Sequence, residues 1–480
     1  MTPQEIRALL TAIEAELPVG EWLIDGVPVW PVFRIWFVFA HDPFAAAANH
    51  ERQSVFAAAA RVGRSLSRYA EAAWRDRVHR DRGGTADAVF FTHTTCRVFE
   101  VEGRWYDQFC EPIAELLAQR GLTSRFLEHA PDHRYRVPRS NDSHLIQPML
   151  SALAVAARPT PVPGERELTA YFARHHPEIQ PSFAAVRKNV AVLRLYARYF
   201  ARELARIRPK LGFVVNYYDL PAMAFDLACR ELGIRTVDIQ HGVQGELHMA
   251  YSHWSHVPTS GYAVLPSLFW CWSEAEARAI RTWSEPVAQW HRPIVAGNLM
   301  LAKFMHDDDA LVQVFDREVV RTASAVNVLV TLRPRGGMPP LLRAAIDASP
   351  REWTWWIRLH PAMLDERAAI DEALAGYRDR RIVVDEATRL PLYALLRHMN
   401  VHLTEISSTV LEADQFGVPS VLCHPRGLDY YAPLARGAIG AFTAPDIVAA
   451  IETQLTRRLS RRTVVTIGAD ELAALVQGGA

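Results

Sequence analysis

The stretch from Arg208 to Gly242, RPKLGFVVNYYDLPAMAFDLACRELGIRTVDIQHG, carries the clearest fold signal in the chain. RPKLGFVVNYYD predicts a strand, PAMAFDLACRELGI predicts a helix that ends at Gly233, and RTVDIQHG predicts the next strand. Two strands joined by a helix pair in parallel, because the helical crossover returns the chain to the same end of the sheet. The stretch therefore predicts a doubly wound parallel sheet.

The same alternation of strand and helix continues on both sides of this unit. ADAVFFTHTT predicts an earlier buried strand, and YDQFCEPIAELLAQRG predicts the helix that follows it. From VNVLVTL at Val326 the rhythm restarts and runs through EWTWWIRLHP, RIVVDEA, VHLTEISS and VPSVLCHP. A chain of 480 residues is too long for one ordinary core. We therefore expect two α/β domains, residues 1–310 and residues 311–480, with extra helical elements near the N-terminus.

Composition excludes several classes of function. Lys and Arg together number 53, as do Asp and Glu, so no global positive field favours nucleic acid. The five cysteines show no C-x-x-C spacing, which indicates neither a zinc site nor a disulfide framework and favours a reducing, cytoplasmic setting. The N-terminal MTPQEIRALLTAIEAEL predicts an amphipathic helix rather than a signal peptide, and no window resembles a membrane span.

Two segments allow a peripheral membrane contact as an alternative to ordinary packing. The aromatic run VPVWPVFRIWFVFA is interrupted by Pro31 and Arg34, and we interpret it as core in preference to a membrane-surface segment. A helical segment that ends at Gly83 carries a series of arginines between positions 61 and 82. A solvated helix face is the simpler interpretation of that series, and binding to anionic lipid or an anionic polymer is the alternative.

Candidate phosphate-binding residues follow the predicted strands of the second domain. Parallel sheets bind ligands beyond the carboxyl ends of their strands, where helices begin with unpaired N–H groups. One strand is followed by Arg358 and His360, and another by hydroxyl residues and a carboxylate one helical turn later. Cations and hydroxyls suit a nucleotide phosphate, and a carboxylate suits ribose. The predicted donor-binding residues are Arg333, Arg358, His360, Ser407, Ser408, Thr409 and Glu412, with Arg335 as a further cation.

Short motifs resemble a known enzyme class. IRLHP and SSTVLEADQFGVPSVL are similar to the donor half of GT-B glycosyltransferases, particularly bacterial enzymes of capsule and lipopolysaccharide assembly that use CMP-activated sugars. Similar motifs occur in polyol-phosphate transferases and in nonhydrolysing UDP-sugar 2-epimerases. GVPVWPVFRI, YDQFCEPI, VVNYYD and TVDIQHGV resemble the N-terminal domain of retaining β-Kdo transferases. The resemblance implies a GT-B-like fold, in which two Rossmann-like domains face a cleft.

The same resemblance implies roles for residues of the first domain. An aspartate in this region of the β-Kdo transferases is a nucleophile that forms a glycosyl-enzyme intermediate, and we assign this role to Asp219 as a hypothesis. Asp238 is the other candidate, and an N-cap is the structural alternative for Asp219. His241 is predicted as a further catalytic residue and Gln240 as a cleft residue; either of these two could instead hold the turn together.

No metal or other cofactor is expected from the sequence. The acidic triplet Asp307 to Asp309 predicts a helix start in a polar segment. The histidines at positions 241, 248, 253 and 256 match no metal-ligand template.

The sequence thus predicts a cytoplasmic glycosyltransferase that moves Kdo, or a similar acidic sugar, from a CMP donor to a capsule or lipopolysaccharide acceptor. Its predicted partners are the nucleotide-sugar donor and the glycan acceptor; the inner membrane or a polysaccharide assembly complex is a further option, and nucleic acid is not expected. Three alternatives stay open: an inverting transferase that uses another nucleotide sugar or CDP-polyol, a UDP-sugar epimerase, and a non-catalytic nucleotide-sugar-binding scaffold.

Overall fold

A computed structural model describes residues 1–41, 84–130, 136–246, 248–334, 336–457 and 459–478. The chain divides into two compact units, and each is described by itself. The first unit comprises residues 1–97, 103–297 and 467–480, and the second comprises residues 98–102 and 298–466. The arginine-rich segment between positions 61 and 82 lies outside the described residues, so its predicted helix stays a prediction.

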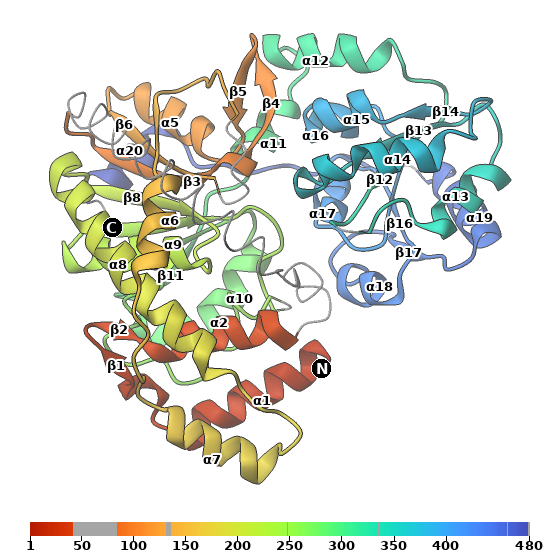
Figure 1. Ribbon diagram of the computed structural model, residues 1–480. Coiled ribbons are helices and arrows are strands. Elements are labelled where there is room, and N and C mark those ends of the chain that lie inside the picture. The colour runs from red at the N-terminus through yellow and green to blue at the C-terminus, as the bar shows by residue number, and fades with distance from the viewer. Residues whose placement is uncertain (42–83, 131–135, 247, 335, 458, 479–480) are drawn as a thin grey trace. The chain divides into compact units, whose positions relative to one another are not determined.

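A seven-stranded parallel sheet forms the centre of the first unit (Figure 1). Its order is β11-β10-β9-β8-β3-β6-β7. The central strands β3 and β8 are completely buried and rich in Val and Phe, as expected for a parallel sheet covered on both faces, whereas the edge strand β11 is partly exposed. Their bounds are β3 Ala88–His93, β6 Ser124–His129, β7 Ser143–Leu145, β8 Leu211–Val215, β9 Arg235–Ile239, β10 Leu268–Cys271 and β11 Arg292–Val295.

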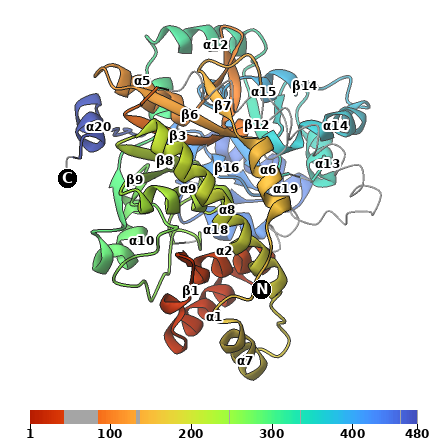
Figure 2. The ribbon, with the colours of Figure 1, turned by 60° about the vertical axis from the view of Figure 1, so that its left-hand side comes forward.

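Helices connect these strands in the manner that the sequence predicts. The chain leaves β3 toward β6 on one side and leaves β8 toward β9 on the other, so right-handed crossovers place α5 and α9 on opposite faces. The long helices α8 and α9 pack side by side (Figure 2). The helices of this part are α5 Cys110–Ala118, α6 Gln147–Ala156, α7 Glu165–His175, α8 Phe183–Ile207, α9 Leu220–Glu231, α10 Glu274–Ser284 and α20 Ala469–Val476.

The N-terminal elements α1 (Pro3–Glu16), β1 (Leu23–Ile24), β2 (Val27–Pro28) and α2 (Val29–His41) join the same hydrophobic core. Arg34, the charged residue within the aromatic run, is fully buried, and its guanidinium pairs with Glu14 at 2.6 Å. The same guanidinium donates to the Ser252 carbonyl and lies over the Trp254 ring. A buried charge needs such partners, so these contacts anchor the added helices to the first unit. The aromatic run is core, as predicted.

The second unit contains a six-stranded parallel sheet of order β14-β13-β12-β15-β16-β17. Its strands are β12 Asn327–Thr331, β13 Thr354–Arg358, β14 Arg381–Val383, β15 Val401–Thr404, β16 Ser420–Leu422 and β17 Ile439–Gly440. Its helices are α11 Leu299–Phe304, α12 Ala310–Val320, α13 Pro340–Ala348, α14 Arg367–Leu374, α15 Asp385–Arg389, α16 Leu392–Leu396, α17 Thr409–Gln415, α18 Pro425–Tyr431 and α19 Ala444–Leu455.

The boundaries between the two units lie at other positions than the expected division at residue 310. Both α11 and α12 belong to the second unit because they pack on α16. The C-terminal helix α20 packs on α5 and belongs to the first unit. Residues of β4 (Arg97–Val101), which pairs with β5 (Arg104–Asp107), also group with the second unit, where Phe99 lies edge-on to Phe315. Sequence periodicity identifies elements but does not show on which domain a helix packs.

The predicted fold class is confirmed in its architecture: two Rossmann-like, doubly wound α/β domains with added N-terminal helices. Asp309 caps α12 through its side chain, and the acidic triplet thus marks a helix start as the sequence predicts. Among the described residues, no helix combines the length and apolar character needed to cross a membrane.

Candidate active site

Each sheet has one position where the chain reverses the direction in which it adds strands. In the first unit this switch point lies between β3 and β8, and in the second it lies between β12 and β15. Loops that leave the carboxyl ends of two such strands diverge to opposite faces, and the space between them is where open α/β sheets bind ligands.

At the switch point of the first unit, Asp219 meets a histidine. His93 is the last residue of β3, and its Nε2 lies 2.9 Å from Oδ2 of Asp219. His129 ends the neighbouring strand β6 and is the direct register partner of His93. The two imidazole centroids lie 5.1 Å apart. Both histidines are more than nine-tenths buried, whereas Asp219 is partly exposed.

The position of Asp219 follows from helix capping. Its Oδ1 accepts a hydrogen bond of 2.7 Å from the amide of Ala222, and Pro221 occupies the first turn of α9. Asp at an N-cap and Pro in the first turn are both favoured local choices. Burial disfavours the charged carboxylate, but the positive charge and hydrogen bond of His93, the charge of His129 and the Ala222 amide together lower the pKa of Asp219. The carboxylate is therefore ionised at neutral pH.

His241 lies after β9, the strand next to β8. Burial, together with the charge of His93, lowers the pKa of His241 to about 4, so its imidazole is neutral at pH 7. Its Nε2 lies 3.4 Å from the hydroxyl of Tyr218, and Phe109 packs edge-on to its ring. A neutral imidazole both donates and accepts hydrogen bonds, which suits the recognition of a sugar hydroxyl.

Asp238 and Gln240 lie beneath this cluster and are fully buried. Oδ1 of Asp238 accepts from the amide of Tyr217 at 3.0 Å, and burial raises its pKa to about 7. The Gln240 side chain donates to the Gly242 carbonyl and accepts from the Trp272 amide. These bonds fix the loops after β8, β9 and β10. Both side chains thus support the loops that carry Asp219 and His241.

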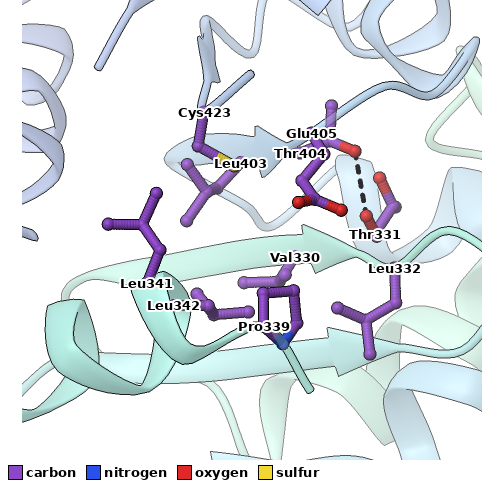
Figure 3. A pocket seen from close by; sticks show the side chains of 10 residues that line it. All are labelled: Val330, Thr331, Leu332, Pro339, Leu341, Leu342, Leu403, Thr404, Glu405 and Cys423. Carbon is purple, nitrogen blue, oxygen red and sulfur yellow. Dashed lines mark hydrogen bonds between the residues drawn. The ribbon is translucent and has the colours of Figure 1, made fainter. Parts of the chain in front are cut away.

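The second unit has a small apolar pocket at its own switch point (Figure 3). Figure 3 shows side chains from β12, β15 and α13 converging on it, and Thr404 donates to the Thr331 carbonyl at its polar end. Glu405 lines the same end and forms a 2.6 Å ion pair with Arg333, so Arg333 is fixed at the switch point. The pocket is lined by Val330, Thr331, Leu332, Pro339, Leu341, Leu342, Leu403, Thr404, Glu405 and Cys423.

The predicted hydroxyl cluster follows Glu405 directly. Ser407 donates to the hydroxyl of Thr409 at 3.1 Å and accepts from the Thr409 amide at 3.3 Å. Ser408 occupies the N-cap of α17, but its side chain makes no capping hydrogen bond in the described structure. Gly427 lets α18 approach this loop, because a Cβ there would lie 2.0 Å from the Glu405 carbonyl oxygen.

Arg358 and Glu412, predicted to hold phosphate and ribose, make internal contacts. Arg358 donates to the carbonyls of Ala387 and Leu390. Glu412 is buried and accepts a 2.9 Å hydrogen bond from Tyr393, which is itself bonded by Asn298. Burial raises the pKa of Glu412 to about 7, although Tyr393 and the charge of Arg358 oppose the shift.

His360 is exposed beyond the end of β13, next to the short 3-10 turn that begins at Pro361. The further cation predicted at position 335 lies outside the described residues. Of the predicted donor-binding residues, Arg333, Ser407, Ser408 and Thr409 lie at the switch point. Arg358 is the last residue of β13, the strand beside it, and His360 follows that strand.

Three residues near the predicted site residues were not predicted from the sequence: His93, His129 and Glu405. His93 ends the apolar strand β3 and His129 ends the mixed strand β6, so the available signal was a histidine at the end of a buried run. Glu405 lies inside the VHLTEISS motif, of which only the hydroxyl residues were predicted to bind a phosphate. The histidines lie near Asp219 because β8, β3 and β6 are neighbours in the sheet. The order of strands in a sheet does not follow from local sequence periodicity, so this proximity was not predictable.

No protein-family model matches the chain, and no curated protein matches it. Among solved structures, a UDP-GlcNAc 2-epimerase from Neisseria meningitidis bound to UDP-GlcNAc shares 12% identity over 82% of this chain and 98% of that chain, with a TM-score of 0.46. The S. aureus MnaA-UDP co-structure shares 10% identity over 82% and 98%, with a TM-score of 0.48. A ugt transferase from Siraitia grosvenorii in complex with UDP shares 11% over 82% and 94%, with a TM-score of 0.42.

None of these three structures is described as a Kdo transferase. The likeness to these structures is one of fold alone.

Proposed function

We propose that this chain is an enzyme that acts on nucleotide sugars. Glycosyl transfer is the first candidate for its activity. The observation that supports this most directly is the presence of a polar cluster at the switch point of each sheet. One cluster holds hydroxyls and a cation beside an apolar pocket, and the other holds an ionised carboxylate beside two histidines. A nucleotide needs the first kind of surroundings and sugar chemistry needs the second.

The second unit is the proposed donor-binding unit. The apolar pocket adjoins the switch point of its sheet, and Glu405 places a carboxylate at the polar end of the pocket. Arg333, Ser407 and Ser408 supply the charge and the hydroxyls for phosphate. Glu412 is bonded to Tyr393, so a role in holding ribose would require that bond to be exchanged.

In the first unit, Asp219 is the proposed reacting carboxylate. Its ionised form is able to attack the anomeric carbon and give a glycosyl-enzyme intermediate, which corresponds to transfer with retention. It is equally able to accept the proton of an acceptor hydroxyl, which corresponds to inversion. His93 and the Ala222 amide fix the carboxylate, and His241 is placed to bind a hydroxyl.

CMP-Kdo is the first donor to test, because the short motifs resemble β-Kdo transferases. A UDP-sugar 2-epimerase is the second candidate, because several solved structures with a similar fold are UDP-GlcNAc 2-epimerases, including the N. meningitidis enzyme bound to UDP-GlcNAc. Removal and return of a proton at a sugar carbon also requires an acid-base cluster such as that around Asp219.

The test is incubation of the purified full-length chain with CMP-Kdo or UDP-GlcNAc, each with and without glycan acceptors. Release of nucleotide that requires an acceptor supports a transferase, and sugar isomerisation without an acceptor supports an epimerase. Intact-protein mass spectrometry then checks for a covalent sugar on Asp219, with Asp219→Asn as the control. Binding of nucleotide with no turnover of any donor would contradict an enzymatic role and leave the scaffold alternative.

A further inference from the structure

We propose that His93, His129 and Asp219 form a binding site for one divalent transition-metal ion of the zinc type. Each residue offers one ligand atom, and the three atoms all lie within 4.8 Å of one another. This site goes beyond the proposed function, and it differs from the sequence-based expectation that no metal is bound. Metal binding does not depend on which sugar, if any, the enzyme processes.

The three ligands come from parts of the fold that cannot separate easily. His93 and His129 are register partners at the ends of the hydrogen-bonded strands β3 and β6. Asp219 is held by the Ala222 amide at the start of α9, which follows β8, the neighbour of β3 on the other side. Figure 2 shows β8, β3 and β6 side by side. A site carried by three adjacent strand ends is preorganised by the sheet itself.

The chemistry of the ligands selects the class of metal. Two imidazole nitrogens and one carboxylate oxygen suit Zn²⁺ and Co²⁺, whereas Mg²⁺ and Ca²⁺ prefer oxygen ligands alone. Bonds of about 2.0–2.2 Å in a tetrahedral site place ligand atoms roughly 3.4 Å apart. The His93 and Asp219 ligand atoms lie 2.9 Å apart and all three ligand atoms lie within 4.8 Å of one another, so the observed spacing brackets that value. Because Oδ1 accepts from Ala222, Oδ2 is the oxygen oriented toward the metal.

A metal ion would take the place of the proton that His93 and Asp219 share across 2.9 Å. Three protein ligands leave one position of a tetrahedral ion for water or a substrate oxygen. If Asp219 is the reacting carboxylate, the ion occupies the lone pair that the reaction needs, and zinc inhibits turnover. This inhibitory consequence, unlike the binding itself, rests on the proposed function.

The binding test uses the full-length chain after dialysis against a chelator. Isothermal titration with Zn²⁺ is expected to give one ion per chain, and Co²⁺ is expected to give the visible absorption of a four-coordinate ion. His129→Ala should weaken binding by at least about tenfold, since even changes to outer-shell partners cost about 10–100-fold. The matched control is His256→Ala, because this histidine is exposed and outside the cluster. Unchanged binding in both His129→Ala and Asp219→Asn would overturn the site, as would no binding by wild type.

A second variant distinguishes loss of a metal ligand from misfolding, because it gives a new signal and not only weaker binding. His129→Cys replaces one ligand by another, so the Co²⁺ complex should gain a near-ultraviolet thiolate-to-metal band that His256→Cys lacks. X-ray absorption of the wild-type zinc complex should show imidazole and oxygen neighbours; a shell without imidazole contradicts the proposal. Stoichiometric zinc binding, together with no turnover of any sugar nucleotide by the metal-free chain, would overturn the proposed function alone. Turnover without zinc binding would overturn the metal site alone.

Discussion

Nε2 of His93 lies 2.9 Å from Oδ2 of Asp219, across the position where the first sheet reverses its direction of growth. The two residues are far apart in sequence, and parallel pairing of β3 with β8 brings their strand ends together. Asp219 is at once a helix cap and a member of a titratable cluster. The capping role and the proposed chemical role are separable, because they use different properties of the side chain.

Asp219→Asn is expected to preserve the fold and abolish most activity. Asparagine caps a helix about as well as aspartate, so the free energy of unfolding should change by less than about 1 kcal/mol. Loss of the negative charge should lower turnover on the order of 10²–10⁴-fold. The measurement is donor turnover alongside thermal unfolding. Asp219→Ala, which removes cap and charge, should lose about 1 kcal/mol more. Near wild-type turnover of Asp219→Asn would rule out a reacting carboxylate at this position.

The strand-helix rhythm and the strand ends were predictable because they depend on local residue patterns. The pattern VVNYYDLP predicts both the end of β8 and the N-cap of α9, and SSTVLEA predicts the start of α17. The partners of the candidate residues were not predictable in this way. Tyr393 reaches Glu412 and His93 reaches Asp219 through tertiary packing, which no local pattern encodes.

Gly212→Ala tests whether close packing of β8 against α9 positions Asp219. A Cβ at Gly212 would lie 2.9 Å from a ring carbon of Phe225 and 3.3 Å from the Cys229 sulfur. Overpacking of this kind costs typically about 1–3 kcal/mol, and displacement of α9 should lower activity as well. Denaturant unfolding gives the free energy, and turnover gives the second readout. Gly376→Ala is the control, because no atom lies within 4 Å of a Cβ added there. Equal stability of the two variants would refute close packing as the constraint.

Glu412→Gln should make stability less dependent on pH between about 5 and 8. The folded-state pKa of Glu412 is raised to about 7, above an unfolded value near 4.3, because the side chain is buried. The protonated form is therefore favoured in the native state, and stability is lost as pH rises toward and through 7. The loss should total on the order of 3 kcal/mol above the folded pKa.

Glutamine keeps a neutral side chain at every pH, and its amide oxygen can accept from Tyr393. The variant should match wild type near pH 5 and exceed it near pH 8, as measured by urea unfolding at each pH. Parallel pH profiles of the two proteins would show that Glu412 is not the titrating group.

Ser408→Ala and Ser407→Ala should separate ligand binding from local structure. The Ser407 hydroxyl bonds to both the amide and the hydroxyl of Thr409, so its removal should cost about 0.5–1.5 kcal/mol of stability. The Ser408 side chain makes no capping bond, so its removal should leave stability nearly unchanged. If Ser408 donates to a phosphate, Ser408→Ala should weaken nucleotide binding by about 3- to 10-fold. Calorimetric titration with CMP and UDP measures this effect. Unchanged affinity in both variants would place the phosphate elsewhere than at the start of α17.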